Sequence, residues 1–350
     1  MMKTTTSKLI TLLSIFFIFS AIITYGQKPG KAGAYLESIG KEFKQISNET
    51  WDYTSAAAHG KKARTVENKR KDLVSQITKS IAKIKNMPGF EGNTSYRDSV
   101  VSYLKLNKLV INEDYAKIVD MEEIAEQSYD AMEAYMLAKE QADDKLEEAS
   151  EMIDEEEKKF AANNNITLLE NKDKISKKLA EAGKVYKYYN VIYLIYFKSS
   201  KQEVYLIDAQ NKGDFNAMEQ NKNALAQYSA EGKKKLAVIK DYKGDNSLKS
   251  SCLELLNFYE KETIKFNEIS DYFIQKEKFE KIKTSFEAKS QSQRTKKDVD
   301  LYNSAGNEFN NSSTKFNATN QLLNQNRSKL LEKWNDTSEK LIDKFVPQKK

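Results

Sequence analysis

The chain has 350 residues, among them 12 Gly, 3 Pro, 1 His and 1 Cys, and its formal net charge is +6. Because Gly and Pro form most tight turns, so few of them argue against an all-β or α/β fold. The single His and Cys exclude a zinc site built from these ligands and an intramolecular disulfide. We therefore expect an all-α protein, and the 19 Tyr and 16 Phe provide apolar area to fold it.

The N-terminal segment has the pattern of a secretory signal peptide. Lys3 and Lys8 precede an apolar run over 9–23, and small residues within 24–26 suit cleavage after 1–26. The run is shorter than the roughly 20 residues that a membrane span needs. No Cys lies near the cleavage point, so a lipoprotein is not expected. We expect an exported protein in the periplasm, at the cell surface or outside the cell, without a stable transmembrane anchor after cleavage. An uncleaved anchor is the alternative.

In the first half, apolar residues at three- and four-residue spacing predict helices. The first ends at 59–60 and the second before 88–89. Asn93, Thr94 or Ser95 is expected to cap the third, with Asp98 as the capping-box acid of Ser95.

The fourth is predicted as one unbroken, coiled-coil-like helix from Met121 to Phe160, with Ser128 on its seam.

A long helix is expected from Leu168 to Asp208, linking the two halves. Its centre, 185–197, is apolar or aromatic on nearly every face. A helix that is apolar all round is normally buried. The alternative is an exposed aromatic surface for a sugar, a lipid or a partner protein. Its candidate residues are Tyr188, Tyr193 and Tyr196.

In the second half, Gly213, Gly232 and Gly244 are expected to separate helices. The polar region 290–314 is expected to fray or kink, and a last helix is expected over 322–345.

The two halves align with each other. Gly92–Leu104 matches Gly244–Leu256 at an offset of 152. Three shorter matches follow the same order: 81–85 with 236–240, 159–163 with 315–319, and 168–172 with 322–326. Such self-similarity predicts a repeat architecture. We expect an elongated protein with two tandem homologous helical bundles, over 33–182 and 183–346, that share the long helix. The alternative is chance similarity between helices of like composition.

Residues 120–159 contain sixteen Asp or Glu and four Lys. Asp143, Glu147 and Glu151 are spaced by four, and such a ladder could hold a divalent cation. No calcium-loop glycine accompanies them, so a solvated acidic face is the favoured interpretation.

A basic cluster includes Lys61, Lys62 and Arg64, followed by 69–71. No nucleic-acid motif accompanies it, so no nucleic acid is expected as a partner. The alternatives are an anionic envelope polymer and pairing with the acidic helix.

His59 is expected at a helix end, where its charge is favoured. Cys252 aligns with Val100 and is expected to be a small buried apolar residue.

With the signal segment, these duplicated Tyr- and Lys-rich helices resemble a group of uncharacterised helical surface or periplasmic proteins of Bacteroidetes and spirochaetes. Gly92–Leu104 and its copy Gly244–Leu256 carry the resemblance, which covers most of the mature chain. It implies a helical exported protein and assigns no activity and no functional residue.

The sequence favours an exported, non-enzymatic helical protein of the cell envelope or surface. It would be structural or bind a protein or an envelope polymer through its helix faces, without a cofactor. P-loop, dinucleotide, nucleophile-elbow and HExxH motifs are absent from the sequence. One alternative is a membrane-active, pore-forming-like protein, for which only 185–197 approaches the apolar hairpin required. Another is a carboxylate-metal enzyme that uses residues 143–151.

Overall fold

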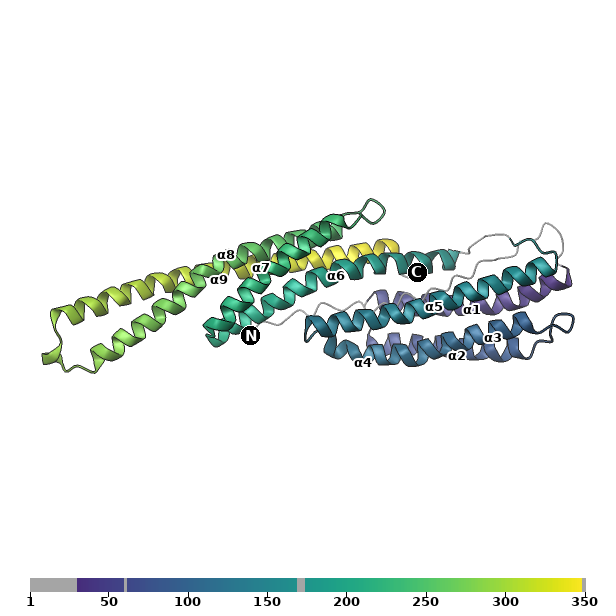
Figure 1. The fold of residues 1–350 in the computed structure, drawn as a ribbon, viewed down its shortest axis with the longest axis horizontal. Helices are drawn as coiled ribbons and strands as arrows, with labels where there is room; N and C mark the ends of the chain where they lie inside the picture. Colours follow the sequence, from purple (N-terminus) through teal and green to yellow (C-terminus); the bar gives the residue numbers. More distant parts are fainter. Residues whose placement is uncertain (1–29, 60–61, 169–173, 348–350) are drawn as a thin grey trace. The chain divides into compact units, whose positions relative to one another are not determined.

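The structure is a computed structural model that describes residues 30–59, 62–168 and 174–347. The predicted signal peptide, 1–26, and Lys61 lie outside these residues. The described residues form α-helices joined by short turns, with two isolated β-bridges and no strand, which confirms the all-α class (Figure 1).

The chain divides into two compact units. Unit 1 comprises residues 1–190 and 338–350, and unit 2 comprises 191–337. The helices α6 (Lys174–Lys212) and α9 (Lys296–Phe345) each belong partly to both units. The predicted repeats instead divide at 182–183, and the duplication stays a prediction.

Unit 1 is built mainly from long helices that pack side by side. The helices are α1 (Lys31–Ala58), α2 (Ala63–Lys85), α3 (Ser95–Leu109), the π-helical turn η1 (Val110–Asp114), α4 (Tyr115–Ala125) and α5 (Tyr129–Asn163). α1 packs on α2, α2 on α3, and both α3 and α4 on α5. Fully buried apolar side chains from α1, α2, α3 and α5 fill the core, among them Ile39, Leu73, Leu104 and Leu146.

A buried arginine accompanies the π-helical turn. The Arg70 guanidinium, on α2, donates from Nη1 to the carbonyl oxygens of Ile111 (2.9 Å) and Asn112 (3.3 Å). Its Nε and Nη2 atoms bind both oxygens of the Glu67 carboxylate. A π-helical turn interrupts the regular backbone ladder, and Arg70 supplies donors to carbonyl groups at that interruption.

The predicted unbroken helix from Met121 to Phe160 is wrong. α4 ends at Ala125, and α5 begins at Tyr129. Ser128 has an extended backbone, and its hydroxyl accepts a hydrogen bond from the Ala131 amide at 3.1 Å, so it is an N-cap rather than a seam residue.

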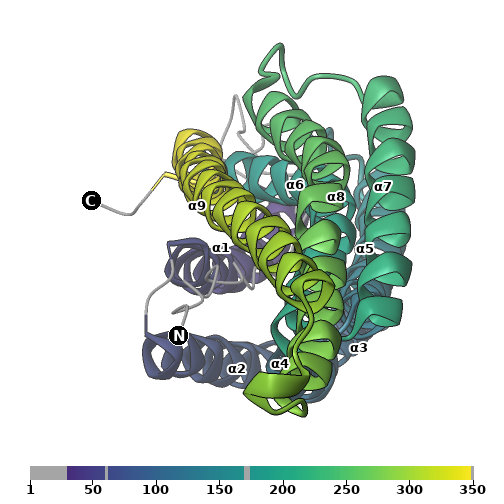
Figure 2. The ribbon, with the colours of Figure 1, turned by 90° about the vertical axis from the view of Figure 1, so that its left-hand side faces the viewer.

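Unit 2 contains the second part of α6, then α7 (Phe215–Val238), α8 (Ser247–Glu287), the short 3₁₀ turn η2 (Gln291–Gln293) and most of α9. α7 lies beside α8 (Figure 2). Gly232 lies inside α7, which contradicts its expected place between helices. A Cβ atom there would lie 3.0 Å from Ile195 and from Leu256, so this glycine permits close packing of α7 on α6 and α8.

The polar region 290–314 is largely helical, contrary to the expected fraying. Only 288–295 lies outside α8 and α9, and it includes η2. Aromatic rings of α8 and α9 stack in pairs between the two helices: Tyr272 with Phe316, Phe279 with Phe309, and Phe286 with Tyr302. These contacts stabilise a stretch whose outward side chains are mostly polar.

The two aligned glycines lie in turns of the same geometry. Glu91 and Gly92 have φ values of 49° and 82°, and Lys243 and Gly244 have 52° and 79°. Each pair is enclosed by an isolated antiparallel bridge. The positive φ values explain a glycine at the second position of both turns.

Of the three expected cap residues of α3, Thr94 occupies the N-cap position, whereas the capping box of Ser95 with Asp98 does not form. Ser95 is the first residue of the helix, and the Asn93 side chain accepts a hydrogen bond from its amide at 2.9 Å. Asp98 is bound by Arg97.

The downstream matches occupy different environments. The ring centroids of Phe160 and Tyr96 are 5.1 Å apart, next to the first turn. Phe316 instead stacks on Tyr272, which lies in α8 far from the second turn.

Candidate functional site

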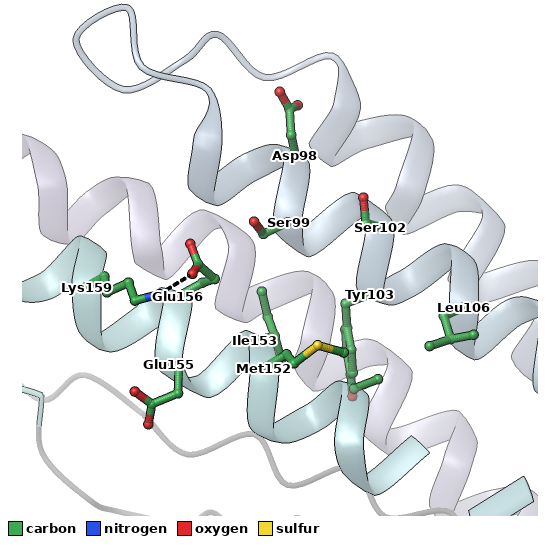
Figure 3. A pocket seen from close by; sticks show the side chains of 11 residues that line it. Asp98, Ser99, Ser102, Tyr103, Leu106, Met152, Ile153, Glu155, Glu156 and Lys159 are labelled. Carbon is green, nitrogen blue, oxygen red and sulfur yellow. Dashed lines mark hydrogen bonds and ion pairs between the residues drawn. The ribbon is translucent and has the colours of Figure 1, made fainter. Parts of the chain in front are cut away.

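A groove runs between α3 and α5 of unit 1 and has a volume of about 650 Å³ (Figure 3). Residues of these two helices line it: Asp98, Ser99, Ser102, Tyr103 and Leu106 from α3, and Ala149, Met152, Ile153, Glu155, Glu156 and Lys159 from α5.

Polar contacts near both ends of the groove join its two helices to neighbouring segments. At the start of α3, Arg97 donates to the Met87 carbonyl oxygen at 2.8 Å and to Asp98. Further along, Lys145 of α5 binds Asp114 at 3.0 Å. The core side of each helix is buried, so the groove lies on the outer side of this helix pair.

The floor of the groove is apolar. Tyr103, Ala149 and Ile153 are at most 5% exposed, and Leu106 is half-buried. Met152 is 63% exposed and is directed along the groove (Figure 3). An unbranched thioether side chain adapts to differently shaped apolar surfaces. The groove therefore presents a solvent-exposed apolar surface between two polar edges.

The edges carry hydroxyl and carboxylate groups. Ser99 and Ser102 lie on the α3 edge, and Lys159 binds Glu156 at 2.7 Å on the α5 edge (Figure 3). The Glu156 carboxylate raises the pKa of Lys159, and the Lys158 ammonium lowers the pKa of Glu155. The cations of this edge are thus already held by neighbouring carboxylates.

No histidine lines the groove beside its serines. The single His of the sequence, His59, lies at the end of α1. Its Nε2 atom is 2.7 Å from the Val346 carbonyl oxygen, and its Nδ1 atom is 2.9 Å from Asp343. His59 is therefore a helix-end residue, as expected, and it also joins the end of α1 to the last turn of α9. Ser99 and Ser102 are suited to hydrogen bonding with a bound molecule.

The structure does not support an aromatic surface made of the three candidate tyrosines. Tyr193 and Tyr196 are 3% and 7% exposed. Tyr196 stacks on Trp334 at 4.6 Å, and Tyr193 stacks on Phe197 at 5.7 Å. Both residues belong to the core of unit 2, in agreement with the buried-helix interpretation. Tyr188 is half-buried.

The predicted basic cluster is divided between surface and core. Lys62 and Arg64 are exposed, and Arg70 is buried. The expected pairing with the acidic helix is wrong for the pairs that the structure describes: Lys69 binds Asp52 at 3.7 Å, and Arg70 binds Glu67. These partners lie on α1 and α2 rather than on α5.

The three carboxylates of the predicted ladder follow one another along α5, but each has a different environment. Asp143 is buried and accepts a hydrogen bond from the Tyr115 hydroxyl at 3.0 Å. Glu147 binds Lys187 of α6 at 3.4 Å, and Glu151 is exposed. Among the described residues, no group of three or more His, Cys, Asp or Glu side chains is placed to hold a metal ion.

Cys252 is fully buried, and its Sγ atom is 4.0 Å from the Ile192 carbonyl oxygen. Burial raises the pKa of this thiol well above its ordinary value. Cys252 is thus a buried core residue, as expected from its alignment with Val100.

No protein-family profile, curated protein or solved structure matches the chain significantly. In the part of the chain that the structure describes, no helix is both long and apolar enough to cross a membrane.

Proposed function

We propose that the chain is an exported, non-enzymatic helical protein of the cell envelope or surface that binds a partner protein in the groove between α3 and α5. The main support for a binding role is the exposed Met152 side chain in an apolar groove with polar edges. Export is inferred from the signal-peptide pattern of residues 1–26.

The energetics of Met152 favour a binding role. A large apolar side chain that stays in water gains roughly 1.5–3 kcal/mol when a partner covers it. Interface cores are enriched in Met, and polar edges around them provide hydrogen bonds that fix the orientation of the partner. Leu106 extends the apolar strip from the α3 side, so a partner side chain would contact both helices.

Binding of helical peptides tests this proposal. A set of peptides with Leu and Met on one face, and with Lys, Gln or Glu on the other, is titrated against residues 27–350 by fluorescence anisotropy. At least one peptide is expected to bind, and Met152→Asp is expected to weaken that binding about tenfold or more, since an apolar contact is lost.

Ile264→Asp is the matched control, because Ile264 is 69% exposed on α8 of unit 2, outside the groove. The proposal fails when no peptide binds, or when both substitutions weaken binding equally.

A further inference from the structure

The solvent-facing side of α5 next to the groove has an uninterrupted acidic stripe. Glu140, Asp144, Glu148 and Met152 follow one another at intervals of four residues, so they form a single ridge on the helix. Glu151 lies beside this ridge. The acidic stripe consists of Glu140, Asp144, Glu148 and Glu151, and all four carboxylates are exposed. The ridge leads directly to Met152 and therefore to the apolar floor of the groove.

These four carboxylates have no basic partner in the described part of the chain. The nearby lysines are engaged elsewhere: Lys145 binds Asp114 at 3.0 Å, and Lys159 binds Glu156 at 2.7 Å. Like charges four residues apart on a helix repel each other. The stripe is consequently a negative surface that the fold itself does not neutralise.

We infer that the partner segment is a basic amphipathic helix, with its apolar side chains in the groove and its Lys or Arg side chains on the stripe. The inference rests on the proposed function, because it assigns the chemistry of the partner to the same groove. An apolar groove selects an amphipathic helix with one apolar face. The adjoining negative stripe selects a partner with cations beside that face, since complementary potentials determine which partners bind.

The dimensions suit a short helix. From Glu140 to Met152 the ridge extends about 18 Å, which corresponds to just over three helical turns. Leu137, one turn before the stripe, is 51% exposed and Leu106 lies across the groove, so apolar contacts are available at both ends of such a segment. A partner helix of about 15 residues would cover the whole surface.

The test compares two peptides with the same Leu and Met face, one with Lys and one with Gln on the polar face. We expect the Lys peptide to bind about tenfold more tightly at low salt, because several exposed ion pairs each add a small amount. Most of this preference should disappear near 0.5 M salt, where the screening length is only a few ångströms.

A charge-neutralised variant provides the decisive comparison. In E140Q/D144N/E148Q/E151Q the preference for the Lys peptide should vanish, while the affinity for the Gln peptide stays the same. The inference is overturned when the Gln peptide binds as tightly as the Lys peptide to the unsubstituted chain, or when the variant retains the preference.

Other outcomes separate this inference from the proposed function. Equal binding of both peptides that still depends on Met152 would contradict the basic partner alone. Binding of neither peptide would contradict both. If sedimentation shows a dimer that Met152→Asp dissociates, the groove is occupied by a second copy of the chain, and the inference of a basic helix is wrong.

Discussion

Glu203 and Glu262 bind the same guanidinium group in the core of unit 2. Arg327 donates from Nε to Glu203 at 2.5 Å and from Nη2 to Glu262. The three side chains come from α6, α8 and α9, and each is at most 5% exposed. Two ionised carboxylates beside one guanidinium would leave an excess negative charge in a low-dielectric interior, so the cluster favours binding a proton and contributes to the pH dependence of unit 2.

The stability of unit 2 should decrease as the pH rises. Burial, together with the Glu203 carboxylate, raises the pKa of Glu262 from 4.5 to about 9. Between these values the folded chain retains a proton that the unfolded chain releases. The free energy of unfolding therefore falls with pH, by at most about 1.4 kcal/mol per pH unit. Urea unfolding at about pH 5 and about pH 8, followed by fluorescence of Trp334 in a Trp51→Phe background, measures the change.

Glu262→Gln is the control for this prediction. The amide keeps the shape of the side chain but does not titrate, so the pH dependence should become markedly smaller. Equal stability of the unsubstituted chain at both pH values would contradict the assignment of a bound proton to this cluster.

Removal of the guanidinium should destabilise unit 2 strongly. In Arg327→Met the Glu203 carboxylate loses its counter-ion and Glu262 loses a hydrogen-bond donor, and breaking a buried ion pair in this way costs about 3–5 kcal/mol. The triple variant R327M/E203L/E262L replaces the whole cluster with apolar side chains and should recover most of that loss. Urea unfolding of the two variants tests the prediction, and a single variant as stable as the unsubstituted chain would refute it.

The glycines should respond to substitution for two different reasons. Gly92→Ala and Gly244→Ala introduce a Cβ at positive φ with free space around it, and each should cost about 1–2 kcal/mol of backbone strain. Gly232→Ala gains helix propensity of about 1 kcal/mol but overpacks Ile195 and Leu256. We expect a net loss at position 232. Thermal unfolding would contradict the packing argument if Gly232→Ala raised Tm.

Cys252 should react with thiol reagents only after unfolding. Its side chain is fully buried and burial raises the pKa of the thiol, so the thiolate is scarce and inaccessible in the folded chain. Labelling with a chromogenic disulfide is expected to be negligible in buffer and complete in concentrated urea. Rapid labelling of the folded chain would place Cys252 in a region that opens readily.

Local sequence signals predicted much of the fold. Periodic apolar residues indicated the all-α class, and the aligned glycines indicated two turns that prove to share positive φ values. Ser128 was misinterpreted because its position suits a helical seam as well as a cap, and only the backbone shows that its hydroxyl binds the Ala131 amide. Gly232 was misinterpreted because a glycine that permits close packing and one that ends a helix look alike in sequence.

The groove depends on tertiary structure and could not be predicted in the same way. Met152 lies within the helix predicted from Met121 to Phe160, but nothing in the sequence shows that α3 leaves its side chain uncovered. The buried state of Tyr193 and Tyr196 followed from the apolar surroundings of the helix, whereas the stacking on Trp334, 138 residues after Tyr196, is a long-range contact.

The affinity of the Lys-faced amphipathic peptide for the unsubstituted chain and for Met152→Asp tests the central claim most directly. Anisotropy titrations at low salt should show binding by the unsubstituted chain and by Ile264→Asp, with a loss of about tenfold or more in Met152→Asp. Unchanged affinity in Met152→Asp, or no binding by the unsubstituted chain, would contradict the assignment of the groove between α3 and α5 as the binding site.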